Sequence, residues 1–123
     1  MTAEELVLRA EAAAANAYAP YSNYLVGASA LTRDGRLFDG CNVENAAYPL
    51  GVCAERTAIA KAASEGLRPG DLEAIGITAS PCGGCRQWLH EFRVSEVSFR
   101  EPDGEIRTTT PDELLPAAWD LRA

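Results

Sequence analysis

Three cysteines stand at two points of the sequence where a helix is expected to begin. Cys53 opens the run Cys-Ala-Glu-Arg, and Cys82 and Cys85 belong to the run Ser-Pro-Cys-Gly-Gly-Cys-Arg. The spacing of the second pair lets both sulfurs face one point on a single helical turn, and the partial positive charge of a helix N-terminus favours thiolates. Three thiolates suit Zn²⁺ and leave its fourth tetrahedral position open, as in catalytic zinc sites. We therefore expect one zinc ion per chain.

Two charged residues after the first cysteine complete the expected site. A carboxylate such as Glu55, placed beside a zinc-activated water, can take its proton and deliver it to a substrate. Residues two apart inside a helix do not face each other, so Cys53 has to act as the helix cap if it is to share a site with Glu55. The guanidinium of Arg56 can offset the negative charge of three thiolates. The residues thus predict Cys53, Cys82 and Cys85 as metal ligands, Glu55 as the catalytic residue and Arg56 as a support for the sulfurs.

The periodicity of apolar residues predicts where helices and strands carry these motifs. Thr2 and Glu5 form a capping box before an alanine-rich helix. The pair Asp34-Gly35 is typical of a β-hairpin turn, and the pair Ser80-Pro81 is typical of an N-cap followed by the first helical residue. The expected elements are a helix over 3–17, strands over 25–31 and 36–42, a helix over 53–65, a strand over 72–79, a helix over 80–92, strands over 94–100 and 105–109, and a short helix or turn over 111–119.

This order of elements predicts an α/β fold. We expect a single domain over residues 1–123, built as a three-layer α-β-α sandwich with one mixed sheet of about five strands. The chain has 123 residues, of which 47% are hydrophobic and 24% are charged, as in ordinary soluble domains. Its length is enough for one core and no second domain.

The charge of the chain excludes several classes of partner. The net charge is -7, which repels polyanions, so we expect neither a nucleic-acid polymer nor an anionic membrane as a partner. The acidic N-terminus does not resemble a signal peptide. We therefore expect a cytoplasmic protein whose cysteines stay reduced.

The sequence resembles a known enzyme family at these motifs and well beyond them. Cys-Ala-Glu-Arg followed by Pro-Cys-x-x-Cys is the signature of zinc nucleoside deaminases, in the variant with three cysteine ligands. Further runs are similar to the small cytidine deaminases, namely those at 18–22, 26–28, 40–46 and 85–92. The resemblance covers most of residues 16–92, together with a Leu-Pro-x-x-aromatic ending at Trp119.

This resemblance implies a reaction and a set of substrate-binding residues. The reaction is the hydrolytic deamination of cytidine or 2′-deoxycytidine to the uridine form, a step of pyrimidine salvage. In the family, a zinc-bound hydroxide attacks carbon 4, and the residue matching Glu55 carries protons to N3 and to the leaving amine. Asn42 and Glu44 match residues that hydrogen-bond the ribose hydroxyls. Tyr24 stands where the family has a phenylalanine near the base, and Ala54 also matches a substrate-binding position.

The resemblance also implies an assembly. The short members of the family are homotetramers in which neighbouring chains complete each active site. Ala46, Tyr48 and Trp119 lie at positions of that kind. We therefore expect a homotetramer whose partner is a small-molecule pyrimidine nucleoside.

Two departures from the family pattern concern the base side of the pocket. The connection between the strand at 72–79 and Ser80 is shorter than in the family, and the hydroxyl of Tyr24 needs a polar partner if it is buried. Neither change touches a metal ligand. They leave open a related aminopyrimidine nucleoside as the substrate.

The residues also permit interpretations from other classes. Cys41 could close a four-cysteine structural zinc site, which would make the chain a non-catalytic, zinc-stabilised interaction domain with no use for Glu55. The Cys-Gly-Gly-Cys run permits a thiol-redox protein, although that activity leaves Cys53 without a role. We expect His90, the only histidine, to be a surface residue or a satisfied core residue.

Overall fold

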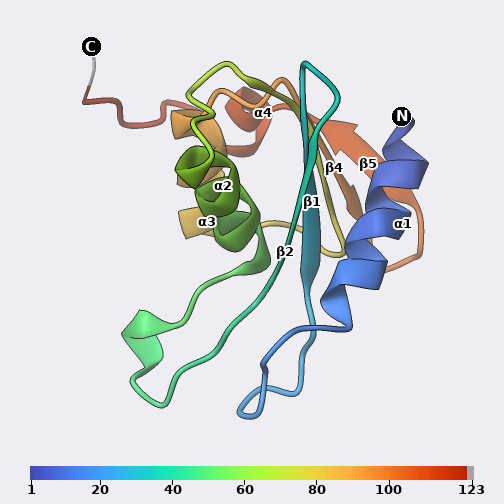
Figure 1. Ribbon diagram of the computed structural model, residues 1–123, viewed down its shortest axis with the longest axis vertical. Helices are drawn as coiled ribbons and strands as arrows, with labels where there is room; N and C mark the ends of the chain where they lie inside the picture. Colours follow the sequence, from blue (N-terminus) through green and yellow to red (C-terminus); the bar gives the residue numbers. More distant parts are fainter. Residues whose placement is uncertain (122–123) are drawn as a thin grey trace.

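The computed structural model describes residues 1–121 and contains one five-stranded sheet (Figure 1). In chain order its strands are β1 (Gly27–Thr32), β2 (Leu37–Cys41), β3 (Leu72–Ile77), β4 (Glu96–Arg100) and β5 (Ile106–Thr109). Their spatial order is β2-β1-β3-β4-β5, with β3 and β4 parallel and the other neighbours antiparallel. The predicted mixed sheet of about five strands is confirmed.

Helices cover both faces of this sheet. The helix α1 (Ala3–Ala14) packs on one face, and α2 (Ala54–Ser64) and α3 (Gly83–Glu91) lie on the other (Figure 1). A short 3-10 turn, η1 (Tyr48–Leu50), precedes α2, and α4 (Pro111–Leu114) contacts α3. This is the predicted three-layer arrangement. Among the described residues, no helix is both long and apolar enough to cross a membrane.

Glycines in the strands let α1 and α2 approach the sheet closely. A Cβ added at Gly76 in β3 would lie 2.7 Å from the carbonyl carbon of Leu6 in α1, and one added at Gly40 in β2 would lie 2.5 Å from the nitrogen of Ala58 in α2. Both distances are too short for real contacts in a close-packed interior. The helix residues that face the sheet are correspondingly small: the fully buried alanines of α1 and α2 are Ala10, Ala54, Ala58 and Ala62.

The first helix is shorter than the sequence predicts. Thr2 caps α1 through the predicted capping box, but the helix ends at Ala14 rather than at residue 17. The backbone of Tyr18 pairs instead with the segment after β2. Its N–H donates to the carbonyl of Asn42 (3.0 Å), and its carbonyl accepts from the N–H of Glu44 (2.8 Å). This pairing takes the chain out of helical geometry and fixes the backbone on either side of residue 43.

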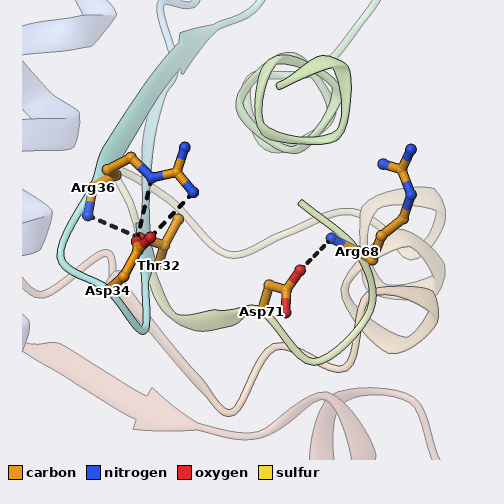
Figure 2. A network of polar contacts seen from close by, with 5 residues as sticks. All are labelled: Thr32, Asp34, Arg36, Arg68 and Asp71. Carbon is orange, nitrogen blue, oxygen red and sulfur yellow. Dashed lines mark hydrogen bonds and ion pairs between the residues drawn. The ribbon is translucent and has the colours of Figure 1, made fainter. Parts of the chain in front are cut away.

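The predicted hairpin joins β1 to β2. Gly35 has a φ of 92°, which glycine adopts most easily. Figure 2 shows the contacts that fix the turn: the N–H of Arg36 donates to Thr32 Oγ1 (2.8 Å), the Thr32 hydroxyl donates to Asp34, and the Arg36 guanidinium pairs with the Asp34 carboxylate (3.2 Å). These contacts set where β2 begins and therefore how it leads into the segment at 42–44.

The start of α3 also differs from the prediction. The sequence predicts a helix from Pro81 with Ser80 as its cap, but α3 begins at Gly83, and Cys82 is the N-cap, with an extended backbone (φ -68°, ψ 169°). The hydroxyl of Ser80 and the carbonyl of Pro81 accept hydrogen bonds from the side chain of Arg86. Two more residues are therefore left outside the helix, and Cys82 takes the cap position.

Candidate active site

Cys53, Cys82 and Cys85 come together where α2 and α3 begin. Cys53 is the N-cap of α2, Cys82 is the N-cap of α3, and Cys85 lies in the first turn of α3. The three sulfurs lie within 4.8 Å of one another, and the Sγ atoms of Cys53 and Cys82 are 3.9 Å apart. The structure thus brings together the three residues that the sequence predicts as metal ligands.

The geometry of these sulfurs fits a zinc ion. Two Zn–S bonds of about 2.3 Å in tetrahedral geometry place their sulfurs about 3.8 Å apart, close to the 3.9 Å between Cys53 and Cys82. Cys85 is buried, Cys53 is half-buried and Cys82 is exposed, so the cluster is open on one side. Three soft donors with an open side match a catalytic zinc site better than a closed structural one.

Cys41 does not belong to this cluster. Within residues 1–121, the potential metal ligands that gather are Cys53, Cys82 and Cys85. Cys41 ends β2, and its carbonyl accepts a hydrogen bond from the hydroxyl of Thr57 (3.0 Å). The closed four-cysteine site, and with it the zinc-stabilised interaction domain, is therefore not supported.

The guanidinium of Arg56 lies against two of the sulfurs. Its Nη2 is 3.5 Å from Sγ of Cys53 and 3.9 Å from Sγ of Cys82. Gly84 leaves room for it, because a Cβ at that position would lie 3.0 Å from Nη2. A cation held at this distance offsets part of the negative charge of the thiolates.

Glu55 is buried beside the cysteines on the first turn of α2. It is 4% exposed, and its carboxyl group interacts with the side chain of Cys85. Burial raises the pKa of Glu55 above its ordinary value, although its own backbone N–H, Cys85 and Arg56 oppose the rise. A carboxyl group with a raised pKa is suited to accept and to donate a proton near neutral pH.

The same surroundings act unequally on the three thiols. Burial raises the pKa of Cys85, and the Glu55 carboxylate raises it further. Burial also raises the pKa of Cys53. Burial acts in the same direction on Cys82, but hydrogen bonds from Cys85 and Arg56 outweigh it and lower the pKa of Cys82. Gathering three thiolates and a carboxylate is therefore unfavourable by itself, and a divalent cation among the sulfurs would offset this repulsion.

A cavity of about 510 Å³ borders the cluster. Cys53 and Arg56 line one part of it, and Asn42 and Glu44, from the segment after β2, line another. Its volume is in the range of small-molecule sites. The cavity therefore joins the predicted metal site to two of the predicted substrate-binding residues.

Asn42 connects this cavity to Tyr24. Its Oδ1 accepts from the N–H of Val26 (2.8 Å), and its Nδ2 donates to the carbonyl of Tyr24 (2.9 Å). Tyr24 itself, which is 60% exposed, lines a second cavity of about 400 Å³ together with residues 78–80. The structure thus places Tyr24 beside the short connection after β3 and not in the lining of the first cavity.

Glu44 is fixed by the turn that follows α1. Its Oε1 accepts from the N–H groups of Tyr21 (3.0 Å) and Ser22 (3.1 Å), and its Oε2 accepts from the Ser22 hydroxyl. These bonds, the one with the Ser22 side chain above all, lower the pKa of Glu44. The side chain is therefore an ionised acceptor held in one place in the cavity wall.

Ala46 and Tyr48 form the outer part of the cavity wall. Tyr48 lies in η1, a turn that the sequence analysis did not predict, and is 91% exposed. An exposed cluster of large apolar side chains is typical of a protein interface. Other exposed large apolar residues that line this cavity are Tyr21, Val43 and Val52.

The C-terminal segment packs along α3. The carbonyl of Trp119 accepts from Gln87 Nε2 (3.0 Å), and the Trp119 residue is 69% exposed. The half-buried His90 lies in α3 with its Nε2 3.7 Å from a carboxylate oxygen of Asp120. His90 is thus a partly buried residue with an acidic neighbour, outside the cysteine cluster.

Two residues with contacts near the site were missed by the sequence analysis. Ser22 holds the carboxylate of Glu44, and nothing in the sequence alone pairs these two positions. Arg86 holds the backbone just before Cys82. Its place directly after Cys85 is the signal that could have identified it.

Comparisons with known proteins agree with this site. The family described as "Cytidine and deoxycytidylate deaminase zinc-binding region" matches residues 1–101. The cytidine deaminase of Sporosarcina psychrophila is 42% identical over 127 residues, which cover 97% of this chain and 92% of that protein. The crystal structure of cytidine deaminase from Burkholderia pseudomallei has 45% identity and a TM-score of 0.91, and covers 97% of this chain and 100% of that one. The cytidine deaminase structure from Mycobacterium tuberculosis has 40% identity and a TM-score of 0.83, with 98% and 99% covered. The chain therefore belongs to the zinc-binding cytidine and deoxycytidylate deaminase family.

Proposed function

We propose that this chain is a zinc-dependent hydrolase that converts cytidine and 2′-deoxycytidine to uridine and 2′-deoxyuridine. The observation that carries the proposal is the buried carboxyl group of Glu55 beside a three-cysteine cluster that borders a cavity of about 510 Å³. A thiol-redox protein would use only Cys82 and Cys85 and would leave Cys53 and Glu55 without a role. The names of the relatives favour cytidine over another aminopyrimidine nucleoside as the substrate.

Each residue of the cluster has a separate role in the proposed reaction. Cys53, Cys82 and Cys85 would hold the zinc ion, which when bound lowers the pKa of a water molecule enough for attack on carbon 4 of the pyrimidine at neutral pH. The carboxylate of Glu55 takes one proton from the attacking water and delivers it to N3; after attack on carbon 4 it takes the second proton of that oxygen and delivers it to the amine, which leaves as ammonia. Arg56 donates toward two of the sulfurs and so withdraws negative charge from the ligand set.

Asn42 and Glu44 are suited to bind the ribose of the substrate. A carboxylate has about four acceptor positions, of which contacts within the chain occupy three in Glu44. The remaining position can accept a ribose hydroxyl. Asn42 Nδ2 carries a second N–H besides the one given to Tyr24. Tyr24 and Ala54 stay predictions as base contacts, because Tyr24 lines the second cavity and the fully buried Ala54 does not line the first.

We also propose that the chain works as a homotetramer with shared active sites. The 91% exposure of Tyr48 on the rim of the cavity supports this assembly, because a partner would bury that ring and Ala46 with it. Trp119 would reach a neighbouring site, since in its own chain it lies along α3 rather than in the cavity wall. Light scattering and activity measured over a range of protein concentrations test this proposal.

The setting that we propose is pyrimidine salvage in the cytoplasm. The net charge of -7 supports a free nucleoside as the substrate and disfavours a nucleic-acid polymer or an anionic membrane as a partner. We expect the whole of residues 1–123 to act as one domain.

Replacement of Glu55 tests the proposed mechanism. Glu55→Gln keeps the shape of the side chain and removes its proton transfer, so turnover should fall by roughly 10²- to 10⁴-fold while zinc content stays unchanged. Glu65→Gln is the matched control, because Glu65 is exposed at the other end of α2, and it should retain full activity. Deamination by Glu55→Gln at the wild-type rate would show that the assigned role is wrong.

A further inference from the structure

The side chain of Arg86 is hydrogen-bonded to the two residues that precede Cys82. Its Nε donates to the carbonyl of Pro81 (2.9 Å), and its Nη2 donates to the hydroxyl of Ser80 (3.2 Å). Its backbone N–H donates to the carbonyl of Cys82 (2.9 Å). Both peptide groups that flank Cys82 therefore accept a hydrogen bond from the same residue.

The backbone at Cys82 needs this external support. Cys82 is an exposed N-cap without a capping hydrogen bond of its own side chain, and two exposed glycines follow it. Glycines lose more conformational freedom on ordering than other residues do. A Cβ at Gly83 would meet nothing within 4 Å, and the nearest neighbours of one at Gly84 would be the Arg56 guanidinium and the Cys82 sulfur. The backbone from Cys82 to Gly84 therefore has few packing contacts, and the hydrogen bonds from Arg86 add to them.

Arg86 also links this loop to the C-terminal part of the chain. Its Nη1 donates to the carbonyl of Leu114 (3.0 Å), the last residue of α4. Leu114 is buried in the main core, so this carbonyl is a fixed acceptor. The planar guanidinium can serve three acceptors in fixed directions, which a lysine ammonium cannot do. The loop before α3 is thereby tied to the core through one side chain.

We infer that Arg86 is a positioning residue for the zinc site: it fixes the backbone of Cys82 against α4 and so keeps this ligand in place for the metal. The inference relies on the part of the proposed function that makes Cys82 a zinc ligand, and it does not depend on the identity of the substrate. Residues that orient metal ligands typically contribute roughly 10- to 100-fold to metal affinity. Loss of the Arg86 contacts should weaken zinc binding by a factor in that range.

Zinc affinity, measured by competition with a chromogenic chelator, tests the inference on the purified full-length protein. Arg86→Met should bind zinc roughly 10- to 100-fold more weakly than the wild type. Arg86→Lys keeps the positive charge but loses the planar guanidinium with its several N–H donors, so its zinc affinity should also fall. Ser80→Ala removes only the contact with Nη2 and serves as a milder variant should Arg86→Met fail to fold; its affinity should fall less, and by a measurable factor.

Arg33→Met is the matched control. Arg33 joins two loops in the same way, through Nε to the carbonyl of Gly70 (2.8 Å) and through Nη2 to the hydroxyl of Ser95. Gly70 follows the C-terminal end of α2, at the opposite end of that helix from Cys53. Arg33→Met should therefore lower thermal stability without changing zinc affinity.

The outcomes separate this inference from the proposed function. Wild-type zinc affinity in Arg86→Met or Arg86→Lys, or an equal loss of affinity in Arg33→Met, would overturn the positioning role and leave the proposed function intact. A wild-type protein that binds no zinc would overturn both. Weaker binding in the Arg86 variants with unchanged binding in Arg33→Met would support the inference, whatever nucleoside the enzyme prefers.

Discussion

Substituting Gly40 by alanine should damage the active site through the packing of α2. The added Cβ would lie 2.5 Å from the nitrogen of Ala58 and 2.6 Å from the carbonyl oxygen of Ala54. Ordinary contact begins at 3.4 Å, so α2 or β2 would have to move by about 0.9 Å in a core that is already close-packed. Both elements carry proposed site residues: α2 carries Cys53 and Glu55, and β2 leads into the segment at 42–44.

The expected magnitude follows from that displacement. A misplacement of about 1 Å can reduce catalysis by about 10²-fold, equivalent to about 2.7 kcal/mol of transition-state free energy. Overpacking should also lower the free energy of unfolding by about 1–3 kcal/mol. The assay is kcat/KM for cytidine, followed by ultraviolet absorbance and normalised to folded, zinc-containing protein, with urea unfolding measured in parallel.

Gly76→Ala is the matched control for this experiment. Its Cβ would overpack α1 by a similar amount, 2.7 Å from the carbonyl carbon of Leu6, but α1 lies on the opposite face of the sheet and carries no proposed site residue. It should lower stability and leave kcat/KM of the folded protein near the wild-type value. Wild-type kcat/KM in Gly40→Ala, or an equal loss in Gly76→Ala, would show that the packing of α2 against Gly40 does not position the active site.

Two further predictions concern individual side chains. Cys41→Ser should leave zinc content unchanged, because Cys41 lies outside the sulfur cluster. Loss of zinc, measured by metal analysis, would instead support a four-cysteine structural zinc site. The hydrogen bonds of Glu44 hold its pKa below the ordinary value of 4.5, so its carboxylate stabilises the fold fully above that pH and loses this effect as the pH falls through the lowered pKa. Glu44→Gln should therefore be less stable than the wild type at neutral pH and lose that difference in acid, and urea midpoints that differ equally at every pH would contradict this.

The general fold and the metal site could be predicted because they depend on local patterns. The turn at Asp34 and Gly35 and the cap at Thr2 are signalled by neighbouring residues. Cys53 and Cys82 each lie within two residues of a predicted helix start, which is enough to bring both to a helix N-terminus although the predicted cap of the second helix is Ser80. Residue type and spacing carry this information without any knowledge of distant contacts.

The features that could not be predicted depend on distant parts of the chain. The alanine-rich sequence favours continuing α1 beyond Ala14, but the backbone of Tyr18 pairs with residues 42–44 and ends the helix earlier. The pair Ser80-Pro81 has the chemistry of a helix start, yet its polar groups are used by Arg86. In both places a long-range or side-chain contact outweighs the local preference.

Zinc-dependent nucleoside deamination can be measured in parallel assays of cytidine and 2′-deoxycytidine, with zinc-loaded protein and with protein stripped by a chelator. The zinc-loaded protein should convert at least one of the two nucleosides to its uridine form, and stripping the metal should abolish this turnover. Folded, zinc-loaded protein that deaminates neither nucleoside, or turnover that survives removal of the metal, would contradict the proposed function.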